Sequence, residues 1–219
     1  MSLVLASNSP RRRQLLSLGG WVFQVTPAQV DESPRPGEAA QAYVLRLAQS
    51  KAQEVASRAG KSDVVVAADT TVAAAGEILG KPSDPLEAEA MLRLLRGKVH
   101  QVYTALAALR VSDGAMLTDW CVTDVPMREY SDNEMAAYIA TGDPLDKAGA
   151  YAIQHPGFRP VAELHGCYAN VMGLPLCHLT RTLARWDIHP QADLPQMCQA
   201  ELQYHCPVFE GVLSSKIQG

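Results

Sequence analysis

The fold is set near the start of the chain, where residues 3–13 read Leu3-Val4-Leu5-Ala6-Ser7-Asn8-Ser9-Pro10-Arg11-Arg12-Arg13. The first four residues are apolar and predict a short buried strand. Ser9 followed by Pro10 is typical of an N-cap and the first position of a helix. The stretch therefore predicts a strand, a tight loop and a helix in immediate succession.

Strand and helix patterns continue to alternate beyond this stretch. Apolar periodicity and capping signals predict helices at 10–18, 37–58, 85–96, 131–142 and 175–186. Runs rich in β-branched residues predict strands at 21–26, 63–68, 100–111, 115–130, 148–154 and 160–164, and a hairpin at 72–79. The alternation, with an antiparallel pair in the middle, predicts one compact α/β unit with a mixed sheet.

Composition excludes several classes of protein. The 219 residues are 47% hydrophobic and 19% charged, which supports a packed core and excludes disorder as the main state. The net charge of −4 argues against a broad basic surface for a nucleic-acid polymer. No apolar run is long enough to span a membrane, and no secretory leader is recognisable, so we expect a cytoplasmic protein. Five scattered cysteines predict reduced thiols.

Three arginines, Arg11 to Arg13, occupy the first turn of the first predicted helix. The helix dipole is already positive at this end, so cations are unfavourable there unless an anion binds. The alternative is three solvated arginines on a surface helix, and position alone does not decide between them.

Three further residues are candidates for chemistry. Lys51 lies on the apolar side of its helix and either extends its ammonium to solvent or meets a buried partner. Asp69 is expected to end the strand 63–68, where it either serves catalysis or caps a turn. Glu32 follows the second strand and supplies another carboxylate.

The sequence lacks the signatures of other catalytic classes. It has no P-loop, no Gly-x-Gly-x-x-Gly, no His-Glu-x-x-His and no Gly-x-Ser-x-Gly. The remaining inventory is that of metal-assisted phosphoryl chemistry, in which carboxylates bind Mg²⁺ or Mn²⁺ and cations face phosphate oxygens. Its members are the cations Arg11, Arg12, Lys51 and Lys81 and the carboxylates Glu32 and Asp69.

Five motifs lie in order along the chain: Leu5-Ala6-Ser7-Asn8-Ser9-Pro10-Arg11-Arg12, Ala68-Asp69-Thr70, Leu79-Gly80-Lys81-Pro82, Asp146-Lys147-Ala148-Gly149-Ala150-Tyr151-Ala152-Ile153-Gln154 and Val171-Met172-Gly173-Leu174-Pro175. Together they closely resemble the Maf family of nucleoside triphosphate pyrophosphatases. The resemblance assigns residues 1–188 to a Maf-like domain and leaves 189–219 as a C-terminal extension of unknown role. Within the family, the motifs containing Thr70 and Gln154 resemble the branch that acts on dTTP and UTP.

The resemblance implies hydrolysis of the α–β phosphoanhydride, with release of a nucleoside monophosphate and pyrophosphate. Asp69 is implied to be the proton acceptor that activates water, and Glu32 and Asp69 the ligands of a divalent Mg²⁺ or Mn²⁺. Lys51 and Lys81 are implied to assist catalysis by neutralising the triphosphate.

The same resemblance assigns substrate binding to Arg11 and Arg12, which face the triphosphate. Choice of base falls to Arg11, Thr70 and Gln154. The side-chain amide of Gln154 offers one donor and one acceptor group, which match the edge that uracil and thymine share.

The family fold is a mixed twisted sheet with flanking helices and two lobes around a central cleft, commonly in a homodimer. Two other functions stay open: a nucleotide-binding regulator of cell division, and a pyrophosphatase for modified purine nucleotides such as 7-methyl-GTP. The chain departs from the Gly-rich family pattern after Gln154, at residues 155–160. The extension is either a dimer-contact arm or a mobile tail.

Overall fold

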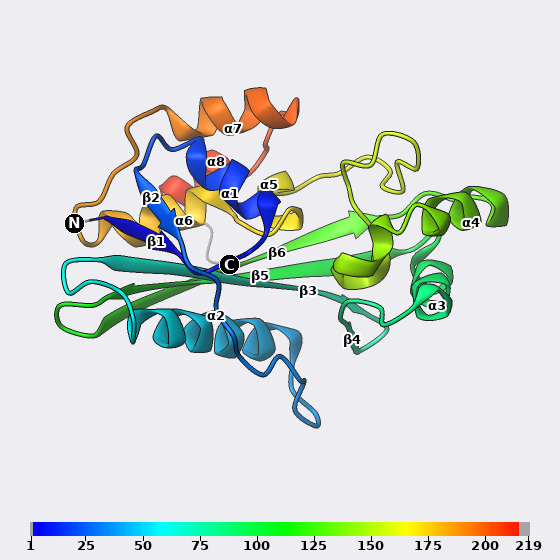
Figure 1. The fold of residues 1–219 in the computed structure, drawn as a ribbon. Helices are drawn as coiled ribbons and strands as arrows, with labels where there is room; N and C mark the ends of the chain where they lie inside the picture. Colours follow the sequence, from blue (N-terminus) through cyan, green and yellow to red (C-terminus); the bar gives the residue numbers. More distant parts are fainter. Residues whose placement is uncertain (1, 215–219) are drawn as a thin grey trace.

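The computed structural model describes residues 2–214 and is built on one mixed sheet (Figure 1). Its strand order is β2-β1-β3-β5-β6, and β4 pairs with β3. β1 is parallel to both neighbours, whereas β5 is antiparallel to both of its neighbours, β3 and β6. The strands are β1 (Leu3–Leu5), β2 (Phe23–Val25), β3 (Val64–Ala74), β4 (Glu77–Leu79), β5 (Val99–Arg110) and β6 (Ala115–Pro126). The mixed α/β fold expected from the sequence is confirmed.

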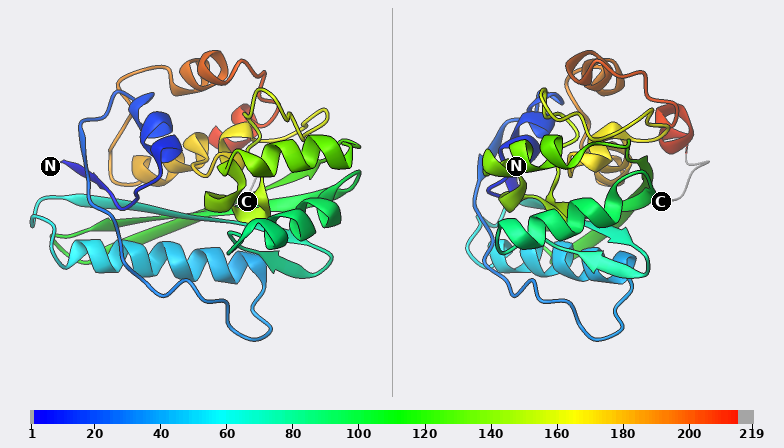
Figure 2. Two further views of the ribbon diagram at one scale, coloured as in Figure 1. Left: turned by 45° about the vertical axis from the view of Figure 1, so that its right-hand side comes forward. Right: turned by 90° about the vertical axis from the view of Figure 1, so that its right-hand side faces the viewer.

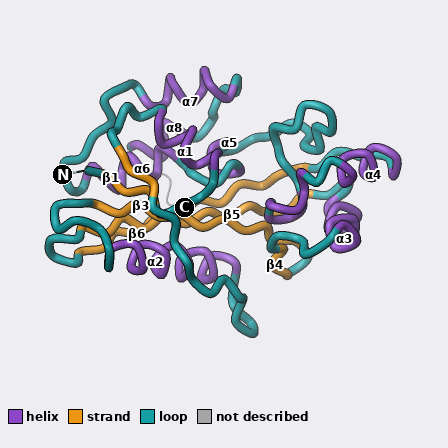
Figure 3. The backbone as a smooth tube through the Cα atoms, in the orientation of Figure 1, coloured by secondary structure: helices purple, strands orange, loops and turns teal. Residues whose placement is uncertain are grey.

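Helices cover both faces of the sheet, as Figures 1 and 3 show. α2 (Ala40–Ala56) packs its apolar side against one face, where Leu47 and Val55 are fully buried. The other face is covered by α1 (Pro10–Ser17), α5 (Tyr168–Val171) and α6 (Leu176–Ala184), with Leu15 and Leu179 in one shared cluster. The apolar sides of these amphipathic helices thus pack against the two faces of one sheet.

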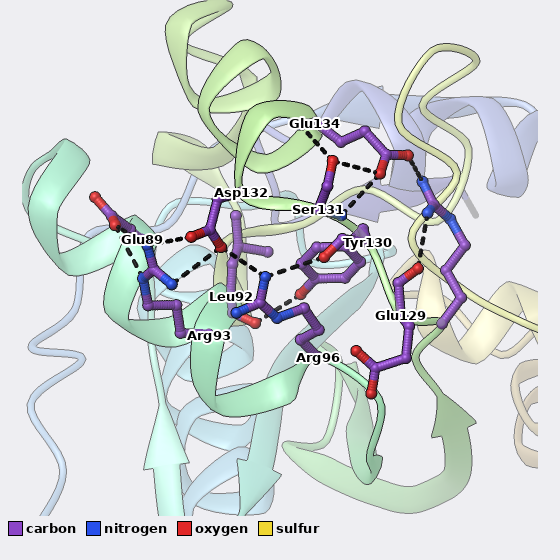
Figure 4. A network of polar contacts seen from close by, with 10 residues as sticks. Glu89, Leu92, Arg93, Arg96, Glu129, Tyr130, Ser131, Asp132 and Glu134 are labelled. Carbon is purple, nitrogen blue, oxygen red and sulfur yellow. Dashed lines mark hydrogen bonds and ion pairs between the residues drawn. The ribbon is translucent and has the colours of Figure 1, made fainter.

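A second lobe forms where β3, β5 and β6 extend past the short strands. α3 (Pro85–Leu95) and α4 (Asp132–Ala140) lie side by side there, as Figure 2 shows. Their buried side chains belong to a second apolar cluster. The capping box predicted at Ser131 and Glu134 is present. Asp132 joins the two helices by accepting hydrogen bonds from Arg93 and Arg96 (Figure 4).

Two expectations about strands are wrong. β3 does not end at Asp69, which lies mid-strand opposite Ala105, because β5 is long enough to pair with the whole run. Segments 148–154 and 160–164 are not strands: the first holds the 3₁₀ turn η2 (Ala148–Ala150) after η1 (Asp143–Asp146), and the second makes only one bridge, at Val161. Positive φ angles at Gly149 and Ala150 break the extended backbone.

The C-terminal extension folds onto the domain through α7 (Leu194–Leu202) and α8 (Phe209–Leu213). Leu194 and Leu202 join the cluster that also holds Leu15 of α1. The indole N–H of Trp21 donates to the carbonyl oxygen of His189 at 2.9 Å. The mobile-tail alternative is therefore wrong for residues 189–214, and the last five residues of the extension lie outside the described part of the chain.

The five cysteines are free thiols. Within residues 2–214, no helix combines the length and the apolar character needed to cross a membrane.

Candidate active site

One cavity of about 420 Å³ lies between the loop after β1, the middle of β3 and the segments around η2. This volume is in the range typical of small-molecule sites. Every residue that the sequence assigned to catalysis, metal binding or substrate binding lines it: Arg11, Arg12, Glu32, Lys51, Asp69, Thr70, Lys81 and Gln154. Side chains separated by up to 143 positions are thus brought to one place.

The start of α1 brings two arginines to the cavity. Ser9 caps the helix by accepting from the backbone N–H of Arg12, and Pro10 occupies the first helical turn. Among residues 2–214, Arg11 has no ion-pair or hydrogen-bond partner, so its charge is available to an anion. Arg12 instead is fixed by the fold: its Nε donates to the carbonyl oxygen of Gly173 at 2.8 Å and its Nη2 to Thr70 Oγ1 at 3.0 Å.

The hydroxyl of Thr70 belongs to a directed hydrogen-bond chain. Thr104 donates its only hydroxyl hydrogen to the carbonyl oxygen of Asn170 at 3.0 Å. Thr70 therefore donates to Thr104, 2.9 Å away, and accepts from Arg12. The hydroxyl hydrogen of Thr70 is thus directed at Thr104, and its oxygen accepts from the guanidinium of Arg12. Thr70 therefore positions Arg12 in this structure.

Gly173 is needed where α5 ends beside these side chains. Its φ is +102°, and a Cβ built on it would lie 3.0 Å from Thr70 Oγ1 and 3.3 Å from Arg12 Nε. Only glycine combines this backbone conformation with so close an approach. The motif around Gly173 thus serves the geometry of Arg12.

Lys51 lies between two carboxylates. It is 8% exposed, and its Nζ is 2.6 Å from Asp69 Oδ1 and 2.5 Å from Glu32 Oε1. The alternative in which Lys51 reaches solvent is excluded. Helix α2 holds the ammonium beneath the cavity, β3 supplies Asp69, and the loop after β2 supplies Glu32.

The two carboxyl groups have opposite pKa shifts. Burial raises the pKa of Asp69, although Lys51 and Arg12 act against the shift. Burial also acts to raise the pKa of Glu32, but the hydrogen bond and charge of Lys51, together with Lys81, outweigh it and lower the pKa. One site thus holds a carboxyl group whose ionised form is favoured, Glu32, beside one whose protonated form is favoured, Asp69.

Lys81 lies on the exposed side of the cavity, in the loop after β4. The N–H of Gly149 donates to the carbonyl oxygen of Gly80 at 3.0 Å, which holds this loop against η2. Within the described residues Lys81 has no ion-pair partner, so it can meet an anionic ligand.

Sequence reasoning missed several cavity residues. Tyr43 donates its hydroxyl to the carbonyl oxygen of Glu32 at 2.8 Å and so holds the loop that carries this carboxylate. Burial raises the pKa of Tyr43 to about 12, which keeps the phenol protonated. Tyr43 precedes Leu47 by four residues and Lys51 by eight, which places all three side chains on one face of the helix and was the available signal. Asp146 and Lys147 also line the cavity.

The acidic residues fit a divalent cation that is shared with a phosphate ligand. Among residues 2–214 no group of three or more His, Cys, Asp or Glu side chains is arranged as a metal site. Mg²⁺, however, is commonly bound through one or two carboxylates, with phosphate oxygens and water completing its shell. Glu32 and Asp69, both facing the cavity, meet that requirement.

Comparison with known proteins gives a matching family and several similar relatives. The pattern of the family described as "Maf-like protein" matches residues 2–186. A protein of Thermomicrobium roseum named dTTP/UTP pyrophosphatase is 44% identical over 221 residues, covering 99% of this chain and 98% of its own. One of Myxococcus xanthus with the same name is 50% identical over 183 residues, covering 84% of this chain and 91% of its own.

Among solved structures, a nucleoside-triphosphatase / dITP/XTP pyrophosphatase from Mycobacterium abscessus is 13% identical, with a TM-score of 0.41. That match covers 85% of this chain and 99% of the other. The family pattern spans most of the chain, and the motifs that match it converge on one cavity. The chain therefore belongs to the Maf family.

Proposed function

We propose that this protein hydrolyses dTTP and UTP to the nucleoside monophosphate and pyrophosphate. The observation that carries the proposal is the convergence of Arg11, Arg12, Lys81 and the triad Glu32–Lys51–Asp69 on one cavity, with Lys51 between the two carboxylates. Relatives at 44% and 50% identity that bear the name dTTP/UTP pyrophosphatase support it.

The cations bind and orient the triphosphate in this proposal. Arg11 and Lys81 approach from the open side of the cavity, and Arg12 presents a guanidinium that Gly173 and Thr70 already hold in place. A fixed positive charge stabilises phosphate oxygens in the transition state without reorganising during the reaction.

Asp69 accepts the proton of the attacking water, and its raised pKa suits that role. The carboxylates of Glu32 and Asp69 hold a Mg²⁺ or Mn²⁺ ion, whose charge helps to neutralise the phosphate oxygens. Lys51 keeps both carboxylates at the cavity by pairing with each of them.

Base choice rests with the rim of the cavity. Gln154 is exposed there and offers its amide to the edge that uracil and thymine share. Thr70 contributes by positioning Arg12. Replacing Gln154 with Ala is expected to weaken the preference for UTP and dTTP over GTP.

The test is pyrophosphate release from dTTP, UTP, CTP, GTP and 7-methyl-GTP, each with Mg²⁺ or Mn²⁺. We expect turnover of dTTP and UTP, and Asp69→Asn is expected to bind nucleotide but to lose nearly all turnover. Asp124→Asn, which changes an exposed carboxylate on β6, is the control and should match the wild type.

Turnover of 7-methyl-GTP alone would overturn the base assignment, and an active Asp69→Asn variant would overturn the role of Asp69. The requirement for a divalent cation is tested by adding a chelator. The homodimer and the cytoplasmic location stay predictions, to be checked by light scattering and by fractionation of the native host.

A further inference from the structure

The segment Tyr151–Gln154, which forms one wall of the cavity, lacks the support of a sheet. All four of its residues line the cavity. It follows η2, has no strand partner, and turns back where the N–H of His155 donates to the carbonyl oxygen of Ala152. Its position must therefore depend on contacts with side chains from other elements.

One such contact comes from α4. The backbone N–H of Ala152 donates to the hydroxyl oxygen of Tyr138 at 3.0 Å. The hydroxyl of Tyr138 in turn donates to Asp143 Oδ2 at 2.8 Å. Tyr138 is 2% exposed, and its ring stacks on Phe158 with centroids 4.4 Å apart. A buried, fixed phenol thus sets the place of Ala152, two residues before Gln154.

Asp143 is anchored from its other side. Its Oδ1 accepts from the ammonium of Lys147 at 2.9 Å. Lys147 gives its two other hydrogens to the carbonyl oxygen of Asp143 at 2.6 Å and to Asp146 Oδ1 at 2.5 Å. Lys147 is 8% exposed, and all three hydrogens of its ammonium are used within this segment. The network runs from the cavity wall at Asp146 and Lys147, through Asp143 and Tyr138, back to the wall at Ala152.

We propose that the Tyr138 hydroxyl is a positioning group for the base-recognition segment Tyr151–Gln154. The inference rests on the proposed function, because it concerns how the same site holds a pyrimidine. Tyr138 is absent from the residues that line the cavity, so it acts through the backbone of Ala152. Arg12 of α1 and Asp69 of β3 are held by separate contacts, with Gly173, Thr70 and Lys51, and do not depend on Tyr138.

Tyr138→Phe tests the proposal because it removes one oxygen and keeps the ring stack. The variant loses both hydrogen bonds of the hydroxyl, and loss of the one from the Ala152 N–H predicts that KM for UTP and dTTP rises about fivefold to tenfold. The preference for UTP over CTP should narrow, whereas kcat for UTP should change less than about twofold. The measurement is steady-state pyrophosphate release at varied nucleotide concentration.

Tyr130→Phe is the matched control. Tyr130 is also 2% exposed, its ring also contacts Phe158, and its hydroxyl donates to the carbonyl oxygen of Leu92 at 2.6 Å (Figure 4). This variant loses the same chemical group from the same lobe, but from a bond that leads away from the cavity. We expect its KM and base preference to equal those of the wild type, even where the two variants lose similar thermal stability.

Wild-type KM and base preference in Tyr138→Phe would overturn the inference, as would equal changes in both tyrosine variants. If Tyr138→Phe does not fold, Asp143→Ala, which keeps the phenol but removes its acceptor, should raise KM in the same way. Activity of the wild-type protein on UTP and dTTP distinguishes failure of the proposed function from failure of the role of Tyr138. If the wild type cleaves neither UTP nor dTTP, the proposed function fails; if it cleaves both and Tyr138→Phe matches it, only the role of Tyr138 fails.

Discussion

At the scale of single residues, the ammonium of Lys51 decides the electrostatics of the site. It contacts both carboxylates, at 2.5 and 2.6 Å, and favours their ionised forms. Without it, the buried carboxyl group of Asp69 would lose its ion-pair partner and would lie beside the negative charge of Glu32. Lys51 therefore lies on the apolar face of α2 because its ammonium pairs with the two carboxylates of the cavity.

Lys51→Met is expected to lower kcat/KM for UTP about a hundredfold. Loss of the cation raises the pKa of both carboxyl groups, since a positive neighbour stabilises their charged forms. Any remaining activity should therefore fall off at a higher pH on the acid side than in the wild type. The measurement is kcat/KM from about pH 5 to pH 9.

Lys61→Met, at an exposed position outside the cavity, is the control for this change. An acid limb that stays in place in Lys51→Met would show that neither carboxyl group governs the rate.

At the scale of elements, sequence patterns predict correctly those features whose interacting residues are close together in the chain. The N-cap at Ser9 and the capping box at Ser131 are both predictable from the sequence because each involves residues three positions apart. Strand β3 was read as ending at Asp69, since its continuation depends on pairing with β5, about 35 residues later in the chain. Segment 148–154 was misread because left-handed backbone at Gly149 overrides an apolar pattern.

The site residues likewise divide into those that sequence motifs identify and those that only the structure reveals. Residues that matched motifs, such as Asp69 and Lys81, were identified, and the cavity gathers them. Tyr43 and Tyr138 were missed because a phenol in an amphipathic helix looks like any other core aromatic residue. Their hydroxyl partners come from other elements, and no spacing rule within one helix reveals such partners.

Helix α7 offers a prediction at this scale. Leu194 is 1% exposed and belongs to the cluster under α1, whereas Met197 on the same helix is 44% exposed. Leu194→Ala should lower the free energy of unfolding by about 3 kcal/mol, and Met197→Ala by less than about 0.5 kcal/mol. Urea unfolding measures both, and equal small effects would show that α7 does not contribute to the core.

At the scale of the whole molecule, buried histidines couple folding to pH. Burial lowers the pKa of His100 to about 4, from an ordinary value of 6.5. Above pH 6.5 the residue is neutral in both folded and unfolded chains, so it has no effect there. As pH falls from 6.5 towards 4, only the unfolded chain binds the proton. The folded state then loses about 3 kcal/mol from this residue.

His100→Gln should therefore make the free energy of unfolding less dependent on pH between pH 6.5 and 4. Denaturant unfolding at several pH values measures the slope, and His205→Gln, at an exposed position, serves as the control. The prediction fails if both variants keep the wild-type slope.

Packing of the C-terminal extension against α1 also bears on how the chain matures during translation. Leu194 and Leu202 are synthesised long after Leu15 and Leu16, although all four residues belong to one apolar cluster. Until then the arginine-bearing helix has part of its apolar side without a cover. A nascent chain would present that side to chaperones or to other chains, because the helix that carries the substrate-binding arginines is fully covered only after the last cavity residue, Gly173, has been synthesised.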